Sequence, residues 1–325
     1  MRAGLQKCGS LSLLGGVVLL AGCSAGLAQL GGGIPDVALG FGAKMPVVGG
    51  SSSLLEGDPP ITTSLSDANF GTDQAQPTRG FLSLASLART PAGGFILKAG
   101  SYELHTQSYC LKAGTHGPGG GDGYLYAPPK GPARDAVVAI VRNSVAHPEI
   151  GQHDIQLLLW AIIARAKFED LAAELKFVAS RLLTPQLIAT LNRTALDLVP
   201  DSAMRSALDR TPAPLRQILE AEARLRQMFA SANASFEQIE SVAVLAGMAP
   251  WGEGSRQVPA GRWSKHPDGY FVRYRPSSYS HTLTQIFVPD RSEAVGKEYD
   301  PALHIAVPGN TSRQRLIQSG RAHQP

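Results

Sequence analysis

The chain has 325 residues, of which 43% are hydrophobic, 17% are charged and only 6% are aromatic, and its net charge is +4 at neutral pH. This length and apolar content are sufficient for one large or two modest domains with a buried core. The 30 basic residues are scattered and form no stripe, so the composition disfavours a nucleic-acid partner.

The first 22 residues have the three zones of a secretory signal peptide. Arg2 and Lys7 form a short basic start, and residues 11–21 (LSLLGGVVLLA) form an apolar stretch. A membrane-spanning helix needs roughly 20 apolar residues, so this stretch is too short to be one. Small residues then lead to Cys23. We therefore predict export and removal of residues 1–22.

The string Leu20-Ala21-Gly22-Cys23 resembles the lipobox of bacterial lipoproteins at every position. The resemblance implies cleavage before Cys23, diacylglycerol on its sulfur and usually a third acyl chain, such as palmitate, on the new amine. Two or more chains make a stable membrane anchor. Ser24 stands where an aspartate would imply inner-membrane retention, so the resemblance implies the outer membrane of a Gram-negative envelope. The alternative is an ordinary export signal with an incidental thiol at Cys23.

Residues 23–92 are rich in Gly, Ser, Ala and Pro, with GGG at 31–33 and GGSSS at 49–53. They show no sustained helical or strand periodicity. A segment of this composition buries too little apolar surface to fold by itself. We predict a flexible, disordered tether that holds the folded part away from the lipid, with short ordered pieces around Val37–Phe41 or Gly80–Leu87 as candidate exceptions.

Residues 93–250 are predicted to form a mainly helical domain with short strands at its start. Two apolar strings, 95–97 and 102–104, flank a turn and indicate a hairpin or two edge strands. From about 133 to 249 apolar residues recur at helical spacing, most clearly from Ile155 to Ile163.

Three helix starts can be placed within this region. Thr184-Pro185 and Thr211-Pro212 each put a proline at the first helical position after a capping residue. Ser235 and Gln238 have the spacing of a capping box.

Strand character returns after residue 250. Side chains in residues 269–275 (GYFVRYR) alternate as in a strand, and a second strand-like string, residues 282–288 (TLTQIFV), follows after a short loop. This pattern predicts a β-hairpin. We assign a β-hairpin subdomain to 251–310 and a frayed tail to 311–325. The predicted fold class is α+β: a helical middle region flanked by short β strands and a C-terminal β-hairpin, after the tether.

Motifs for phosphate binding, metalloprotease and serine-hydrolase chemistry are missing from the sequence, and we predict no cofactor. The histidines at 105, 116, 147 and 153 lack the tight pair spacing of zinc ligands, so we predict no metal site.

Cys110 is the one thiol left after Cys8 is removed with the leader and Cys23 takes lipid. The mature chain therefore has no partner for an intramolecular disulfide. An unpaired cysteine in an exported protein can be explained by burial, by pairing with another molecule or by a chemical role of its thiol.

Two short strings suggest a chemistry for this thiol. Ser108-Tyr109-Cys110-Leu111 places it after an aromatic residue at a predicted strand end, and Ile155 to Trp160 (IQLLLW) opens an apolar helix. The pair is similar to bacterial surface thioester domains, in which a Tyr-Cys string and a hydrophobic-Gln-x-x-hydrophobic-hydrophobic string supply an internal Cys–Gln bond. The resemblance implies that Cys110 is the thiol and Gln156 the acyl donor of a bond that acylates amines or hydroxyls. It departs at Ile155, where the family usually has Thr.

Two other interpretations of Cys110 remain open. As a small buried hydrophobe it would have no chemical role. As the nucleophile of an envelope hydrolase it would need a converging base, for which His147, His153, Asp154 and Asn143 are available.

Aromatic residues concentrate in the predicted C-terminal hairpin. Alternation puts Tyr270 and Tyr274 on one face, and Trp263 lies just upstream. An exposed face of this kind would stack sugars or hold a partner protein, and the alternative is that the face packs on the helices. We predict a non-enzymatic, lipid-anchored binding or assembly module for an envelope protein or polysaccharide, with covalent attachment through the thioester as the alternative and the hydrolase third.

Overall fold

The computed structural model describes residues 59–63, 65–68, 75, 77, 80–196, 198, 201–209, 211–231 and 233–323. The predicted mixture of helices and strands is confirmed. The predictions for the signal peptide, the lipidated Cys23 and the tether up to residue 58 lie outside the described residues.

The helices and strands follow one another in this order. The helices are α1 (Arg134–Asn143), α2 (Gln152–Ile163), α3 (Ala173–Leu182), α4 (Pro185–Thr194), α5 (Asp201–Leu208), α6 (Ala213–Ser231) and α7 (Phe236–Ala243). The strands are β1 (Leu82–Ser83), β2 (Phe95–Ile96), β3 (Gly100–Cys110), β4 (Thr115–His116), β5 (Tyr124–Ala127), β6 (Val244–Leu245), β7 (Ser264–Lys265), β8 (Phe271–Pro276), β9 (His281–Val288), β10 (Glu298–Tyr299), β11 (Ile305–Pro308) and β12 (Leu316–Ala322).

One eight-stranded sheet organises the fold, with the strand order β5-β11-β12-β3-β9-β8-β7 and β1 added beside β3. Its pairs are antiparallel except for β1 with β3. The main-chain N–H of Tyr126 in β5 donates to Ser264 Oγ in β7 at 2.9 Å, so the sheet curls until these two strands lie close together. Two small pairs, β2 with β10 and β4 with β6, stand outside the sheet.

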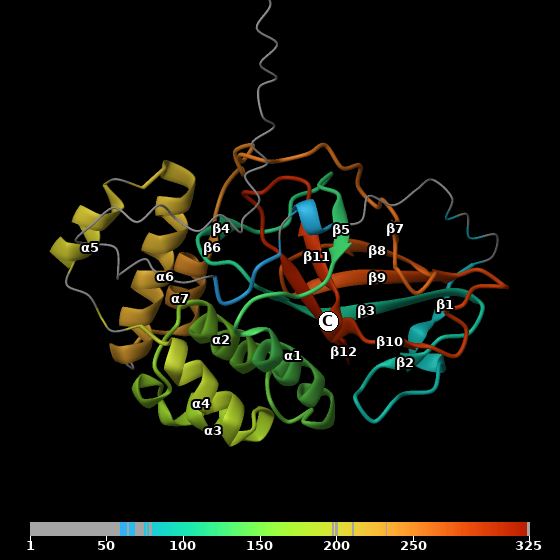
Figure 1. Cartoon of the computed structure of the whole chain (residues 1–325), viewed down its shortest axis with the longest axis horizontal. Coiled ribbons are helices and arrows are strands. Elements are labelled where there is room, and N and C mark those ends of the chain that lie inside the picture. Colours follow the sequence, from blue (N-terminus) through green and yellow to red (C-terminus); the bar gives the residue numbers. More distant parts are fainter. Residues whose placement is uncertain are drawn as a thin grey trace, which may run out of the picture. The chain divides into compact units, whose positions relative to one another are not determined.

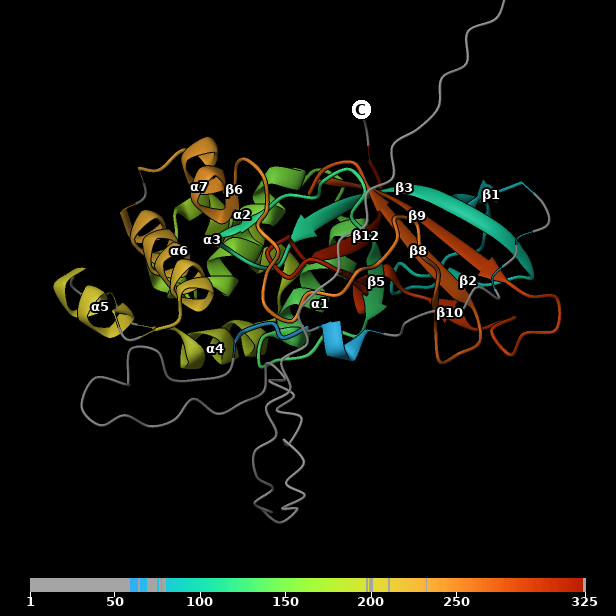
Figure 2. The ribbon, with the colours of Figure 1, turned by 90° about the horizontal axis from the view of Figure 1, so that it is seen from above.

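Helices α1 and α2 lie against the sheet, where they contact β12 and β3, and the remaining helices gather beyond them (Figures 1 and 2). Eight of the twelve α2 residues are buried, because α2 has the sheet on one side and α3, α6 and α7 on the other. One continuous hydrophobic core extends from Ile61 to Ile317 and joins the helices to the sheet.

Two of the predicted helix starts are confirmed. Thr184 caps α4 by accepting a hydrogen bond from the Leu187 N–H, and Ser235 with Gln238 forms a complete capping box at α7. The third helix, α6, begins at Ala213, so Pro212 precedes it instead of opening it.

The predicted boundary at residue 250 divides a single sheet, and that division is wrong. β3 and β5 precede the boundary, yet β3 pairs with β9 and β5 pairs with β11. The predicted tail contains β12, which lies between β11 and β3 at the centre of the sheet. Its hydrogen-bonded Gln318 and Ser319 are buried, which hides the strand from a search for apolar alternation.

The extent of the tether and one of the two hairpins also need correction. Ile61 and Leu84 are buried in the core, so the folded part begins well before residue 93. Isolated apolar side chains in a Gly/Pro-rich segment carry no periodicity, although they still cover a core. β2 pairs with β10 instead of turning back on β3, whereas the predicted hairpin of β8 and β9 is present.

Candidate functional site

The candidate site lies at the carboxyl end of β3, where β3 extends beyond the end of its pairing with β9. β9 pairs with β3 only as far as Gln107, opposite His281. β3 continues to Cys110, with β12 on its other side opposite Leu316. The Ser108 carbonyl and the main-chain N–H and carbonyl of Cys110 therefore need other partners.

Two glutamines of α2 supply those partners. Gln152 Nε2 donates to the Ser108 carbonyl at 3.1 Å and to the Ser280 carbonyl at 2.7 Å. Gln156, one helical turn later on the same face, accepts from the Cys110 N–H at 2.8 Å and donates from Nε2 to the Cys110 carbonyl at 3.2 Å. The structure thus brings together the two residues that the sequence paired, with both polar atoms of the carboxamide on the main chain of the cysteine.

The Cys110 thiol is fully buried, and Gln156 is 2% exposed. Burial raises the pKa of this thiol well above its usual range, and the negative charge of Glu240 raises it further. The protonated thiol is therefore the resting form, and the site as it stands is not that of a free thiolate.

Aromatic side chains and one carboxylate cover this end of β3. Tyr279, in the turn between β8 and β9, donates from its hydroxyl to Glu240 of α7. The ring centroids of Tyr279 and Trp160 are 6.2 Å apart, and those of Trp160 and Phe236 are 5.7 Å apart. His153 stacks on Phe236 at 4.0 Å.

Two buried polar groups near the thiol make no hydrogen bond among the described residues: the Tyr124 hydroxyl and Trp160 Nε1. Burial raises the pKa of Tyr124, with smaller contributions from other charges that include Cys110. A buried donor without a partner costs roughly 1–3 kcal/mol, and it is available to any acceptor that forms there.

The residues named for a hydrolase do not converge on the thiol. No hydrogen bond links Cys110 to a histidine in the described part of the chain, because His147 pairs with Glu149 and His153 stacks on Phe236. A hydrolase must also admit both a substrate and water to its nucleophile, and the Cys110 thiol is fully buried. The described contacts therefore give no support to the third-ranked alternative, a hydrolase with Cys110 as its nucleophile.

The predicted aromatic binding face is also wrong, because its side chains are interior. Tyr270 and Tyr274 are 0% and 1% exposed and belong to the main core. Trp263 is 8% exposed and lies on the other face of the sheet, in a small cluster with Ala75 and Phe271. The alternative interpretation, a hairpin face that packs inward, is what the structure shows.

Tyr270 instead belongs to a buried chain of hydrogen bonds. Its hydroxyl donates to His304 Nε2 at 2.5 Å, and His304 Nδ1 donates to the Asp300 carbonyl at 2.7 Å. The Asp300 carboxylate pairs with Arg142. Burial lowers the pKa of His304 to about 3, and it lowers the pKa of the neighbouring His266 to about 4. Tyr270, His304 and the Asp300 carbonyl thus satisfy one another, whereas the buried hydroxyls of Tyr274 and Tyr299 make no hydrogen bond among the described residues.

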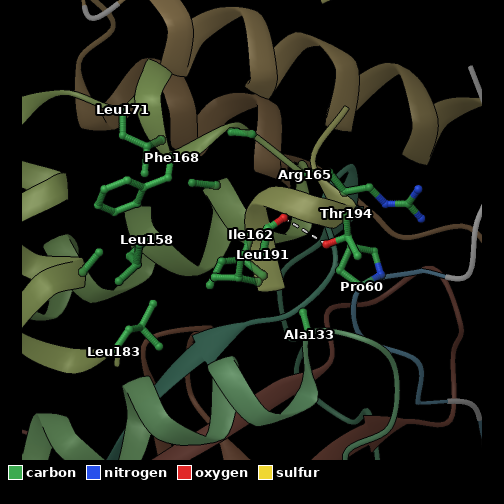
Figure 3. Close-up of a pocket in the computed structure, with 13 residues that line it drawn as sticks. Pro60, Ala133, Leu158, Ile162, Arg165, Phe168, Leu171, Leu183, Leu191 and Thr194 are labelled. Atoms are coloured by element: carbon green, nitrogen blue, oxygen red, sulfur yellow. Dashed lines mark hydrogen bonds between the residues drawn. The ribbon is translucent and has the colours of Figure 1, made fainter. Parts of the chain in front are cut away.

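Two cavities lie away from the thiol. One, of about 30 Å³, lies between α2, α3 and α4 and is lined mostly by apolar side chains that include Leu158, Ile162 and Leu191 (Figure 3). It has room for about one water molecule. The other, of about 410 Å³, is an open cleft between α5 and α6. Neither of these two cavities is lined by Cys110 or Gln156.

The described residues hold no grouping of three or more His, Cys, Asp or Glu side chains arranged to bind a metal ion. Within the same residues, no helix has both the length and the apolar character needed to cross a membrane.

Sequence reasoning missed Gln152, Glu240 and Tyr124 as parts of the site. The position of Gln152, four residues before Gln156, was a usable signal, because side chains at that spacing share a helix face. Glu240 and Tyr124 carried no local signal, because only the tertiary fold brings α7 and β5 near the end of β3.

Comparison with known proteins gives no match: no family model, no curated protein and no solved structure is significantly similar to this chain.

Proposed function

We propose that the folded part of this chain is a covalent attachment domain, which forms an internal thioester between Cys110 and Gln156 and transfers the acyl group to a partner surface. The observation that carries the proposal is the hydrogen bond from the Cys110 N–H to Gln156 Oε1, at 2.8 Å. It holds the acyl donor against the residue that bears the thiol. It also puts an N–H donor on the oxygen where negative charge develops during attack at the carboxamide carbon.

Bond formation balances without a cofactor. The Cys110 sulfur attacks the Gln156 carboxamide carbon, the C–N bond breaks, and the thiol proton leaves with the nitrogen as ammonia. The Cys110 N–H stabilises the tetrahedral intermediate throughout, since it keeps its bond to the acyl oxygen. Burial of both residues excludes the water that would hydrolyse the product.

The competing interpretation is structural. Gln156 satisfies the Cys110 N–H and carbonyl where β9 has ended, just as Gln152 satisfies the Ser108 carbonyl. A sheet-edge role of this kind requires the carboxamide to stay intact. The two interpretations therefore predict different covalent structures, and a chemical test can distinguish them directly.

Trapping with methylamine tests the proposal. The thioester predicts one methylamine adduct, mapped to Gln156 as a methylamide, together with one newly reactive thiol at Cys110. The Cys110→Ala variant should form no adduct. A wild-type chain that stays unmodified under conditions in which it remains folded would contradict the proposal.

We also propose that the chain is a lipoprotein of the outer membrane, anchored through acyl chains on Cys23. The support is the sequence Leu20-Ala21-Gly22-Cys23 and the signal-like zones before it. A membrane-anchored electrophile needs no cofactor in the envelope and would stay beside its target. Cys23→Ala should move the protein from the membrane to the soluble fraction. Unchanged membrane association would contradict the anchor.

A second candidate is a non-covalent binding or assembly module for another envelope protein or a polysaccharide. Two exposed apolar side chains favour it, Met248 at 93% and Trp251 at 63%, both in the connection from β6 to β7. Exposed aromatic residues are frequent anchors of interfaces. A partner recovered from membranes with wild type and lost with Trp251→Ala, from a chain without a thioester, would favour this module over covalent attachment.

A further inference from the structure

The closed state of the thiol raises the question of how an acceptor reaches it. Cys110 and Gln156 line neither of the two cavities described, and both residues are buried. Reaction with a partner therefore requires a cover to open. The covering groups are contributed by two elements, the β8–β9 turn and α7.

The β8–β9 turn is fixed close to the thiol by main-chain contacts to β3. The Ser108 N–H donates to the Ser280 carbonyl at 2.9 Å, and Ser108 Oγ donates to the Tyr279 carbonyl at 3.0 Å. Ser108 is two residues before Cys110, so the turn ends beside the thiol. The Tyr279 ring is half-buried against the core, within 6.2 Å of Trp160.

Helix α7 is fixed to the segment that follows Cys110. The Gly114 N–H donates to the Ala243 carbonyl at 3.0 Å, and β4 pairs with β6, which follows α7 directly. These contacts tie α7 to the segment that leaves β3 after Cys110. Glu240 is half-buried on this helix, and its charge acts on the thiol.

One side-chain contact joins the two elements over the site: the Tyr279 hydroxyl donates to the Glu240 carboxylate. The other groups nearby are aromatic, namely Trp160, Phe236 and His153. A single hydrogen bond between half-buried side chains contributes little net free energy, so it can open without unfolding the domain. Its opening frees a carboxylate at the edge of the buried site.

We propose that Glu240 receives the acceptor, that this acceptor is a primary amine such as a lysine side chain, and that the Tyr279–Glu240 contact is the latch that keeps the thioester closed until the amine arrives. The inference rests on the proposed thioester. An ammonium group is attracted to the carboxylate and replaces the Tyr279 hydroxyl there, whereas a neutral hydroxyl gains no such charge pairing.

The transfer step balances with Glu240 as proton carrier. The ammonium first releases one proton to solvent, and the resulting neutral amine attacks the Gln156 acyl carbon. The nitrogen of the tetrahedral intermediate then loses one proton to the Glu240 carboxylate. The C–S bond breaks, and Glu240 returns that proton to the Cys110 sulfur. The products are an amide at Gln156 and a free thiol. Positioned acid–base groups contribute about 10²–10⁴-fold to such steps.

The experiment compares wild type with Glu240→Gln and Tyr279→Phe, by intact mass and by the rate of addition of small amines. All three proteins should show the loss of one ammonia that marks the thioester. Methylamine should add at least about 100-fold more slowly to Glu240→Gln than to wild type, in keeping with the usual size of acid–base catalysis. Tyr279→Phe should react faster than wild type with methylamine and with water, because the latch is gone.

A charge-selectivity readout separates this role from simple loss of structure. Wild type should prefer methylamine to glycine, whose carboxylate is repelled by Glu240, and Glu240→Gln should lose that preference. Glycerol should add to neither protein. Glu237→Gln, which changes an exposed carboxylate one turn earlier on α7, is the matched control and should behave as wild type.

The outcomes distinguish the two proposals. A wild-type chain of full mass contradicts the thioester, and the acceptor role falls with it. A wild-type chain with the ammonia loss, together with a Glu240→Gln variant that reacts with amines at the wild-type rate or has no thioester, overturns the acceptor role alone.

Discussion

The buried groups around His304 and those around Cys110 both have shifted pKa values, and the two clusters differ in the contacts that surround those groups. Around His304, a tyrosine hydroxyl, an imidazole and a main-chain carbonyl form a chain in which each donor has an acceptor. In the Cys110 cluster, the residue that bears the thiol also donates its main-chain N–H to the carboxamide oxygen of Gln156. Burial and shifted pKa values are therefore common to both clusters. Of the two, the Cys110 cluster alone holds a carboxamide against a residue that bears a thiol, and the proposed thioester depends on that difference.

The clusters also differ in where they lie on the sheet. The His304 cluster includes Tyr270, beside the β7–β8 turn, and is enclosed by the core. The Cys110 cluster lies where β3 outruns β9, so the side chains of a helix complete the strand edge. An edge completed by side chains can exchange its partners without unfolding the sheet, which a reactive bond requires.

The largest expected effect separates two glutamines one turn apart on α2. Gln156→Glu should abolish both ammonia loss and methylamine trapping, because a carboxylate is a poor acyl donor to a thiol. Gln152→Glu alters a neighbouring edge contact and should keep both reactions. The measurement is intact mass after methylamine treatment. Equal reactivity of the two variants would contradict the assignment of Gln156 as the acyl donor.

A second expectation concerns pH and belongs to the His304 cluster. The folded pKa values of His304 and His266, about 3 and about 4, lie below the ordinary value of 6.5. Between those values the unfolded chain binds protons that the folded chain does not, so each histidine makes the free energy of unfolding fall as pH drops, by about 1.4 kcal/mol per pH unit. Burial raises the pKa of Glu222 to about 7, and this group acts with the opposite sign.

Because those contributions add, a difference between proteins is the clean measurement. His266→Gln should make the slope of unfolding free energy against pH, obtained by urea denaturation between about pH 4 and 6.5, less positive by about 1.4 kcal/mol per pH unit. Thioester formation should be unaffected at pH 7. Identical slopes for wild type and variant would show that His266 is protonated in the folded state.

A third and smaller effect tests whether the His304 cluster is structural only. Tyr270→Phe leaves His304 Nε2 without its donor and should lower the free energy of unfolding by about 1–3 kcal/mol. Methylamine trapping at Gln156 should continue at the wild-type rate. Loss of trapping in a variant that remains folded would mean that the two clusters are coupled and that the contrast drawn between them is wrong.

Local sequence signals predicted the centre of the candidate site. The strand ending at Cys110 and the apolar helix with Gln156 could both be recognised from short strings, because strand and helix periodicities are local properties. The distance between the two residues could not be recognised in this way. It depends on where β9 stops beside β3, which the pairing of the sheet determines.

The fold was predictable where a pattern was local and not where tertiary packing decided. Alternation placed Tyr270 and Tyr274 on one face of a hairpin but did not indicate which face the core covers. β12 was assigned to a tail because its buried Gln318 and Ser319 resemble surface residues in composition. Gln318 Nε2 and Ser319 Oγ donate hydrogen bonds to main-chain carbonyls inside the fold, and such partners are visible only in three dimensions.

The most direct measurement of the central claim is the intact mass of the Cys23→Ala chain, purified without amines and compared with the same chain carrying Cys110→Ala. A thioester predicts a mass lower than the sequence value by one ammonia, and the Cys110→Ala chain should have its full sequence mass. A Cys23→Ala chain with its full sequence mass would contradict the account and leave Gln156 as a structural partner of the β3 edge.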